Sequence, residues 1–269
     1  MGETEIRSIK DYLDALVPDT QNSVHGDLSV FRGQRDATWA LYPSIVRRPL
    51  FDPTKSLASD PDDPKDTSAE RRLLIVFRDQ AVTLLPEWVW IGSPEEVAWK
   101  HVLVAQHYRL PTRLLDWSTN PLVALYFAVE GQPELCSDKC AHDEREVDDG
   151  KHRSVVYVLR HRDSFSVQSL AKANSKPPLY HGDQDPGVIR PPAIDKRIVA
   201  QNGVFTVSRE PTKPVRVDAA FYIKAKHRED ILQQLDVCGV NHKTVYPDLE
   251  HLGEYLKWSV PRWQPRACK

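Results

Sequence analysis

Apolar residues recur at helical spacing in several separate stretches of the chain. Between residues 5 and 17 they fall at Ile6, Ile9, Leu13 and Leu16, and Pro18 ends the pattern. This spacing predicts an amphipathic helix over residues 5–17. The same reasoning predicts further helices within residues 67–86, 93–111, 120–129, 228–237 and 248–258. Ser93-Pro94 and Asn120-Pro121 supply a cap residue followed by a proline suited to the first helical turn.

Short apolar and β-branched runs predict strands at residues 28–31, 154–160, 204–208 and 215–225. Polar, aperiodic segments separate the elements. We expect a mobile loop at 52–68, an inserted acidic surface loop at 131–153 and a proline-rich loop at 174–192. Helices and strands do not alternate regularly, which favours a single α+β domain over residues 1–269 rather than a doubly wound sheet.

Composition narrows the class of protein. The chain has 269 residues and a formal net charge of -2, so no basic domain points to nucleic acid. It contains no apolar run long enough to cross a membrane and no signal-peptide pattern at its start. We therefore expect a cytoplasmic protein without a membrane partner. Cys136 and Cys140 lie near His142, but their spacing differs from the usual zinc pairs, and we expect no metal.

The segment from His101 to Val129 carries many polar side chains between two apolar patterns. An unpartnered buried polar group costs about 1–3 kcal/mol, so these groups either satisfy one another or face a ligand. The polar members are Gln106, His107, Arg109, Arg113, Asp116, Ser118, Thr119 and Asn120.

Two interpretations compete for most of these residues. Arg113 and Asp116 either form a buried structural pair or orient groups that touch a ligand. Asn120 is best explained as a helix cap. For Ser118, capping and binding an anion at a helix N-terminus are comparable interpretations, and in the second of them Thr119 is a further donor. Gln106 and His107 stay as candidates for contacting a ligand.

A second group of candidates follows the predicted strand at 28–31. Phe31-Arg32-Gly33-Gln34 combines an arginine, whose planar guanidinium suits phosphate or carboxylate, with a glycine that permits close backbone approach. On three residues alone, a tight turn with a surface arginine is the simpler interpretation.

Four blocks of the chain together resemble the FRG-domain family, named for its Phe/Tyr-Arg-Gly motif. They cover most of the chain from Glu5 to Trp258. Arg109 stands where the family usually has glycine, and Ser118 where threonine is usual. The blocks are residues 31–34 with 41–47, 105–117, 197–205 and 239–255.

A more remote resemblance, to ADP-ribosyltransferase folds, follows the same order of motifs. It implies a mixed, largely antiparallel sheet with flanking helices, and NAD as substrate. Arg32 would then contact NAD phosphate or ribose, and Ser118 or Thr119 would line the nicotinamide pocket. Gln201 stands near the place where a catalytic glutamate is expected, and an amide cannot act as a carboxylate.

These resemblances lead to a defined set of expectations. The implied activity is ADP-ribosyl transfer to a macromolecule or NAD hydrolysis, in a toxin, stress or phage-defence context. The alternatives are a non-catalytic module that binds a nucleotide or a protein, and an effector that targets nucleic acid. The catalytic candidates are Arg32, His107, Asp116 and Gln201. The candidates for binding NAD are Arg32, Gly33, Gln34, Arg113, Ser118 and Thr119.

Overall fold

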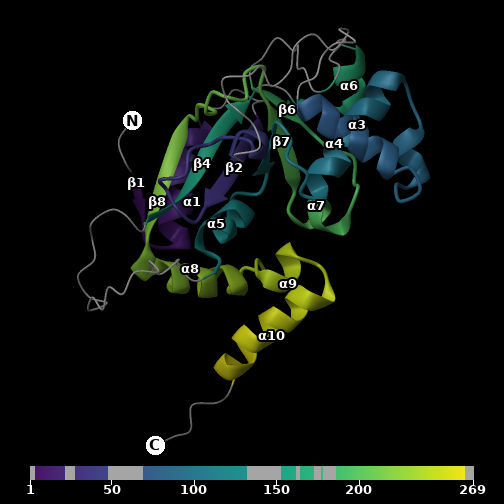
Figure 1. Ribbon diagram of the computed structural model, residues 1–269. Helices are drawn as coiled ribbons and strands as arrows, with labels where there is room; N and C mark the ends of the chain where they lie inside the picture. Colours follow the sequence, from purple (N-terminus) through teal and green to yellow (C-terminus); the bar gives the residue numbers. More distant parts are fainter. Residues whose placement is uncertain are drawn as a thin grey trace, which may run out of the picture.

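The computed structural model describes residues 4–21, 28–47, 69–131, 153–161, 164–172, 177 and 186–263. In these residues the chain forms one eight-stranded sheet flanked by helices, in the strand order β1-β8-β4-β2-β3-β7-β6-β5 (Figure 1). The strands are β1 (Thr4–Ile6), β2 (Leu28–Gln34), β3 (Leu114–Ser118), β4 (Arg153–His161), β5 (Ser164–Phe165), β6 (Gly187–Ile189), β7 (Gly203–Val207) and β8 (Ala219–Lys224).

The helices fall between these strands and after the last one. They are α1 (Ile9–Gln21), α2 (Ser44–Arg47), α3 (Ala69–Gln80), the 3₁₀ turn η1 (Glu87–Trp90), α4 (Pro94–His107), α5 (Pro121–Val129), α6 (Val167–Lys172), α7 (Lys196–Ala200), α8 (Ala225–Val237), α9 (His242–Val245) and α10 (Leu249–Trp263). None of the helices in the described ranges is long and apolar enough to cross a membrane.

Pairing in the sheet is mostly antiparallel, and only β1–β8 and β5–β6 run parallel among the described strands. The two central strands β2 and β3 are weakly paired. β2 pairs with β4 along its full length, and β3 pairs with β7 along its full length, but β2 and β3 pair at a single position, Phe31 with Ser118. The two strands therefore separate beyond that pair.

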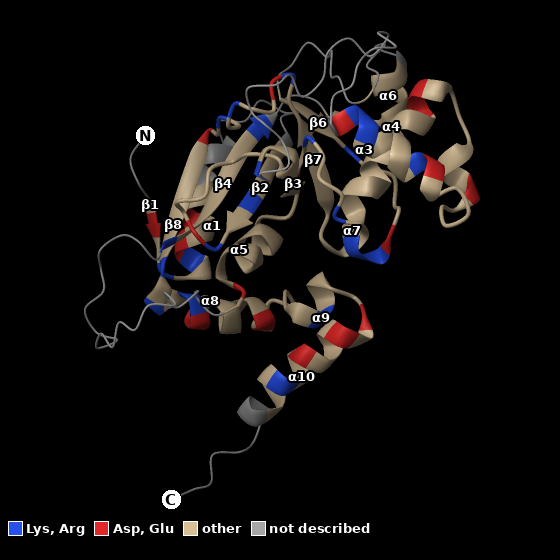
Figure 2. Cartoon of the chain, viewed as in Figure 1, with Lys and Arg blue, Asp and Glu red and all other residues tan. Residues whose placement is uncertain are grey.

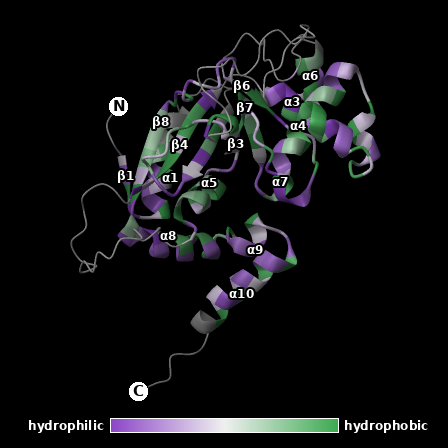
Figure 3. Ribbon diagram, viewed as in Figure 1, coloured by the Kyte–Doolittle hydropathy of each residue, from purple (hydrophilic) through white to green (hydrophobic). Residues whose placement is uncertain are grey.

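Helices cover the two halves of the sheet separately. A core of α1, α5 and α8 packs on β1, β8, β4 and β2, and includes Tyr12, Leu125 and Ile231. A second core packs α4 and α6 against β3, β6 and β7, with Trp99 fully buried. In Figure 3 the hydrophobic colour concentrates in the sheet and the helices packed on it, while α8 and α10 alternate between the two colours.

Several local predictions are confirmed because their causes are local. Ser93 caps α4 in a capping box with Glu96, and Pro94 is its first residue. Asn120 caps α5, its side chain accepting from the backbone N–H of Leu122. The predicted helices near residues 228 and 248 correspond to α8 and α10, and the α+β class with a mixed sheet is also confirmed.

Other boundaries were wrong where a distant partner decides the structure. Residues 4–6 form β1, because they pair with β8 more than 200 residues later, and the helix begins only at Ile9. Residues 114–118 form β3, a strand that the hydrophobic pattern did not predict. The loop expected at 174–192 contains β6. Residues 52–68, Cys136, Cys140 and His142, and the acidic insertion apart from its two end residues, lie outside the described residues.

Candidate functional site

A cleft of about 480 Å³ lies where β2 and β3 separate. Its walls come from β2 and the turn after it, the C-terminal end of α4, the C-terminal end of α5, and α7 with the start of β7. Figure 2 shows basic residues on β2 and on α7, two of the elements that line the cleft. The sequence candidates that line it are Arg32, Gly33, Gln34, Gln106, His107, Asp116, Ser118 and Gln201.

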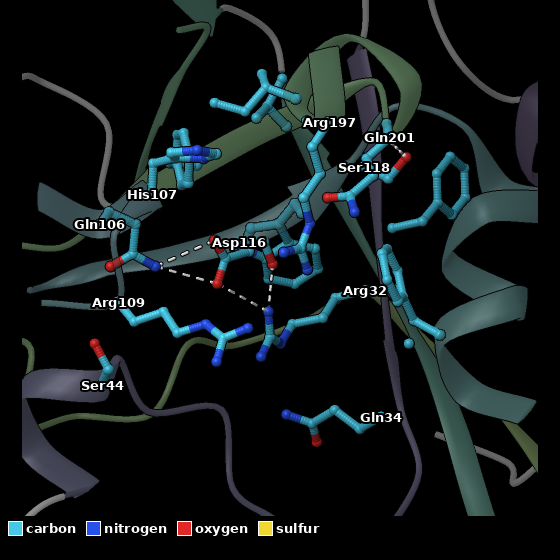
Figure 4. A pocket seen from close by; sticks show the side chains of 18 of the residues that line it. Arg32, Gln34, Ser44, Gln106, His107, Arg109, Asp116, Ser118, Arg197 and Gln201 are labelled. Carbon is cyan, nitrogen blue, oxygen red and sulfur yellow. Dashed lines mark hydrogen bonds and ion pairs between the residues drawn. The ribbon is translucent and has the colours of Figure 1, made fainter. Parts of the chain in front are cut away.

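Arg32 reaches from β2 into the gap between the strands (Figure 4). Its guanidinium donates to the backbone carbonyl of Asp116 at 2.5 Å, and lies 3.8 Å from the carboxylate Oδ2 of the same residue. Burial lowers the pKa of Arg32 to about 10, with Asp116 opposing and Arg47 adding to that shift, so the group stays charged at neutral pH. Arg32 thus holds β3 where a ladder hydrogen bond is missing.

Two buried polar atoms of β2 are left without a hydrogen-bond partner among the described residues. They are Nε of Arg32 and Oε1 of Gln34. Arg32 and Gln34 are two positions apart on one strand and therefore point to the same side of it. A buried unsatisfied group costs about 1–3 kcal/mol, so this part of β2 is under local polar strain.

Asp116 is held from the other side by Gln106. The side-chain amide of Gln106 donates to both carboxylate oxygens of Asp116, at 3.1 and 3.2 Å, and its own oxygen accepts from Thr112 Oγ1 at 2.6 Å. Asp116 is itself 61% exposed in its side chain. Gln106, expected to touch a ligand, therefore orients a carboxylate that faces the cleft.

Arg113 and Asp116 do not form the buried pair that one of the two interpretations predicted. Arg113 instead makes a bidentate ion pair with Glu70 of α3, at 2.9 and 2.5 Å, and both side chains are almost fully buried. The two candidates are separated because Arg113 precedes β3 while Asp116 is the one exposed residue within it. Arg113 does not line the cleft.

Ser118 and Thr119 are engaged with the backbone. The Ser118 hydroxyl donates to the Gln201 carbonyl at 2.7 Å and accepts from the Asn120 N–H at 3.0 Å. The backbone N–H of Thr119 donates to the Asn202 carbonyl at 3.0 Å, and Thr119 does not line the cleft. These contacts fasten the end of β3 to the α7–β7 turn.

Gln201 and His107 occupy the wall formed by α7 and α4. The Gln201 amide donates to the Val245 carbonyl at 3.2 Å, which links this wall to α9. His107 Nε2 lies 3.7 Å from Oδ2 of Asp195, and its ring packs edge-on against Tyr108. Both side chains line the cleft, with their polar ends directed toward protein groups.

A family model matches the segment that builds most of this site. Residues 27–135 match the FRG domain family model. Searches of curated proteins and of solved structures found no match. The matched residues, which we call the FRG segment, run from β2 to the end of α5 and contain Arg32, Gln106 and Asp116. Arg197 and Gln201 lie after it.

Gly33 of the FRG segment is explained by packing. A Cβ at this position would lie 1.9 Å from the Ala124 carbonyl oxygen and 2.6 Å from the Ala128 nitrogen, both in the backbone of α5. The close approach that only glycine allows is therefore made to a helix rather than to a ligand.

The cleft contains arginines besides Arg32 that the sequence analysis did not list as site residues. Among the described residues five arginines line it: Arg32, Arg35, Arg47, Arg109 and Arg197. Arg109 has a φ of 63°, a backbone conformation that favours glycine, and this explains why an arginine is unusual there. Trp39, in the turn between β2 and α2, adds an aromatic side chain that is 43% exposed.

Glu130, the first residue after α5, is the carboxylate that sequence reasoning missed. It lines the cleft and accepts from the Tyr246 hydroxyl at 3.1 and 3.2 Å. Burial raises the pKa of Glu130 to about 7, while the Tyr246 hydrogen bond and the charges of Arg35, Arg197 and His251 oppose that rise. One feature of the sequence could have identified Glu130: it is the first charged residue after a continuously apolar helix.

The described residues contain no group of three or more His, Cys, Asp or Glu side chains arranged to hold a metal ion. The chemistry available in the described part of the cleft is therefore that of arginine cations, two carboxylates, one imidazole and aromatic rings.

Proposed function

We propose that the cleft binds a nucleotide through its phosphates, with NAD as the ligand, and that the protein is an ADP-ribosyltransferase-like enzyme that transfers ADP-ribose or hydrolyses NAD. The observation that carries this proposal is Arg32, which places a largely buried cation, 15% exposed in its side chain and with an unpartnered Nε, among further arginines of one cleft. Guanidinium groups form planar, charge-assisted hydrogen bonds with phosphate oxygens.

Two further features support a nucleotide over a simple phosphate. The cleft volume of about 480 Å³ lies in the range typical of small-molecule sites. Trp39 supplies an exposed aromatic face beside the arginines, suited to stacking with a base. The order of Arg32, Ser118 and Gln201 along the chain is also that of the ADP-ribosyltransferase resemblance.

The competing candidate is a non-catalytic module that binds the same class of ligand. It is favoured by two hydrogen bonds: the Ser118 hydroxyl donates to the Gln201 carbonyl, and the Gln201 amide donates to the Val245 carbonyl, so both donors already have a protein partner. Binding of NAD without turnover would support this candidate.

The test compares wild-type protein with Arg32→Gln and with Arg72→Gln, which removes an exposed arginine of α3 away from the cleft. NAD should raise the melting temperature of the wild type and of Arg72→Gln, and should have little effect on Arg32→Gln. Labelled NAD with cell lysate then reports label transfer, and chromatography reports free nicotinamide. Absence of a thermal shift, label transfer and nicotinamide release in the wild type would overturn the proposal.

A further inference from the structure

Glu130 lies at the point where the FRG segment meets the C-terminal helices. Its backbone N–H donates to the Tyr126 carbonyl at 2.8 Å and caps α5, so the start of its side chain is fixed by the helix. The carboxylate extends to the cleft wall, where both oxygens are within hydrogen-bond distance of the Tyr246 hydroxyl.

Two side chains pack on the ring of Tyr246. The guanidinium of Arg197 lies 4.6 Å from the ring centroid, and the imidazole of His251 stacks at 4.4 Å with an interplanar angle of 17°. His251 is anchored in turn by Asp248, 2.6 Å from its Nδ1. The hydroxyl that contacts Glu130 is thus placed by α7 and by the start of α10.

The environment of Glu130 differs from that of a structural carboxylate. Glu70 shows the structural case in this protein, because it is buried in a bidentate pair with Arg113. Glu130 makes no ion pair within 4 Å among the described residues, although the charges of Arg35 and Arg197 act on it. It has a neutral hydrogen-bond donor and an opening to the cleft, and so is free to exchange a proton.

The other carboxylate of the cleft is less suited to that task. Asp116 is 61% exposed, receives two hydrogen bonds from Gln106 and lies near the Arg32 guanidinium. Both carboxylate oxygens of Asp116 therefore already accept a hydrogen bond. Glu130, with a pKa raised to about 7 by burial, gains and loses a proton near neutral pH.

We propose that Glu130 is the catalytic general base of the cleft, accepting the proton of the nucleophile that attacks the bound NAD, with Tyr246 as its positioning residue. This inference rests on the proposed function. A bond forms between the oxygen of water or an acceptor hydroxyl and C1′ of the nicotinamide ribose. The C1′–nitrogen bond breaks, its electron pair neutralises the pyridinium, and nicotinamide leaves. The proton of the nucleophile passes to the Glu130 carboxylate and then to solvent.

The decisive variant is Glu130→Gln, which keeps the size of the side chain and an acceptor for Tyr246. Its matched control is Glu254→Gln, which changes an exposed glutamate of α10 that pairs with Lys257. We expect Glu130→Gln to keep NAD affinity within about threefold and to lose nicotinamide release by at least 100-fold, in the range that general bases contribute. The control should keep both properties.

The outcomes separate this inference from the function it rests on. If the wild type releases nicotinamide and Glu130→Gln does so at more than a third of the wild-type rate, the inference is overturned and the proposed function stands. Wild-type binding without turnover overturns the inference and favours the non-catalytic module. A wild type that does not bind NAD overturns both. If Glu130→Gln does not fold, Glu130→Asp replaces it, and a rate within threefold of wild type with the shortened carboxylate counts against the inference.

Tyr246→Phe tests the positioning role through a pH profile. The hydrogen bond from Tyr246 lowers the pKa of Glu130, so its removal should move the acidic limb of kcat/KM to higher pH. The other groups acting on Glu130 are Arg35, Arg197, His251 and Tyr126, all unchanged in this variant. A rate loss with an unmoved acidic limb would overturn the positioning role.

Discussion

Gly33 of β2 and Ala124 of α5 approach so closely that a Cβ on the glycine would lie 1.9 Å from the alanine carbonyl oxygen. Both partners are backbone within regular elements, so neither can move without shifting a strand or a helix. We predict that Gly33→Ala destabilises the fold by about 3 kcal/mol, at the upper end of overpacking costs. Urea unfolding measures this. Gly253→Ala is the matched control, because a Cβ there meets nothing within 4 Å, and equal stability of the two variants would contradict the prediction.

The buried pair of Arg113 and Glu70 gives a second prediction. Glu70→Gln should destabilise the protein by about 3–5 kcal/mol, because it leaves the Arg113 guanidinium buried beside a neutral group. The double variant Glu70→Leu with Arg113→Met should recover most of that loss, since it removes both charges from the core. Chemical denaturation of the three proteins checks this, and a double variant as unstable as the single one would refute it.

Arg109 lies in the left-handed region with a φ of 63° and lines the cleft. Arg109→Gly and Arg109→Ala both remove the cation, and we expect both to weaken NAD binding several-fold. Only glycine adopts this backbone conformation without strain, so Arg109→Gly should be about 1 kcal/mol more stable than Arg109→Ala. Isothermal titration and thermal unfolding separate the two effects. A glycine variant that binds NAD as tightly as wild type would show that the cation makes no contact.

Glu130 makes stability depend on pH in a defined direction. The folded protein binds its proton more tightly than the unfolded chain, because the folded pKa is raised from 4.5 to about 7. The resulting stabilisation is fully present below about pH 4.5 and is lost as the pH rises through about 7, by up to about 3 kcal/mol. Glu130→Gln cannot titrate there. The difference in unfolding free energy between wild type and Glu130→Gln should therefore shift against the wild type between pH 4.5 and 8, and a constant difference would disprove the assignment.

Helix caps form between neighbouring residues, whereas ion pairs can join residues far apart in the sequence, and this difference explains what the sequence could predict. Ser93 and Asn120 form their contacts within three residues, so the start of α4 and of α5 follows from the local sequence. Arg113 pairs with Glu70, which is 43 residues away, and not with the nearer Asp116 that one of the two interpretations gave as its partner. The FRG motif located Arg32, whereas the role of Gly33 depends on where α5 lies.

The charged residues that line the cleft together were harder to predict, because they come from distant parts of the chain. Arg197 and Tyr246 reach Glu130 from parts of the chain more than 60 residues away, and no local pattern joins them. Arg109 stands where the FRG pattern usually has glycine, and its φ of 63° explains the usual glycine rather than the arginine. Chemistry-bearing residue types can therefore be read along the chain, but which of them share a cleft is decided by strand order.

The single register pair between β2 and β3 also has a mechanical consequence. Sheet hydrogen bonds resist shear in proportion to their number, and this junction has the fewest among the central strands that the structure describes. A ligand that contacted Arg32 on one side and Arg197 on the other would brace the two halves of the sheet against each other. Amide hydrogen exchange at the junction should then slow on ligand binding. The position where the sheet has the fewest hydrogen bonds between strands is therefore also the position where a bound ligand would reduce local opening most.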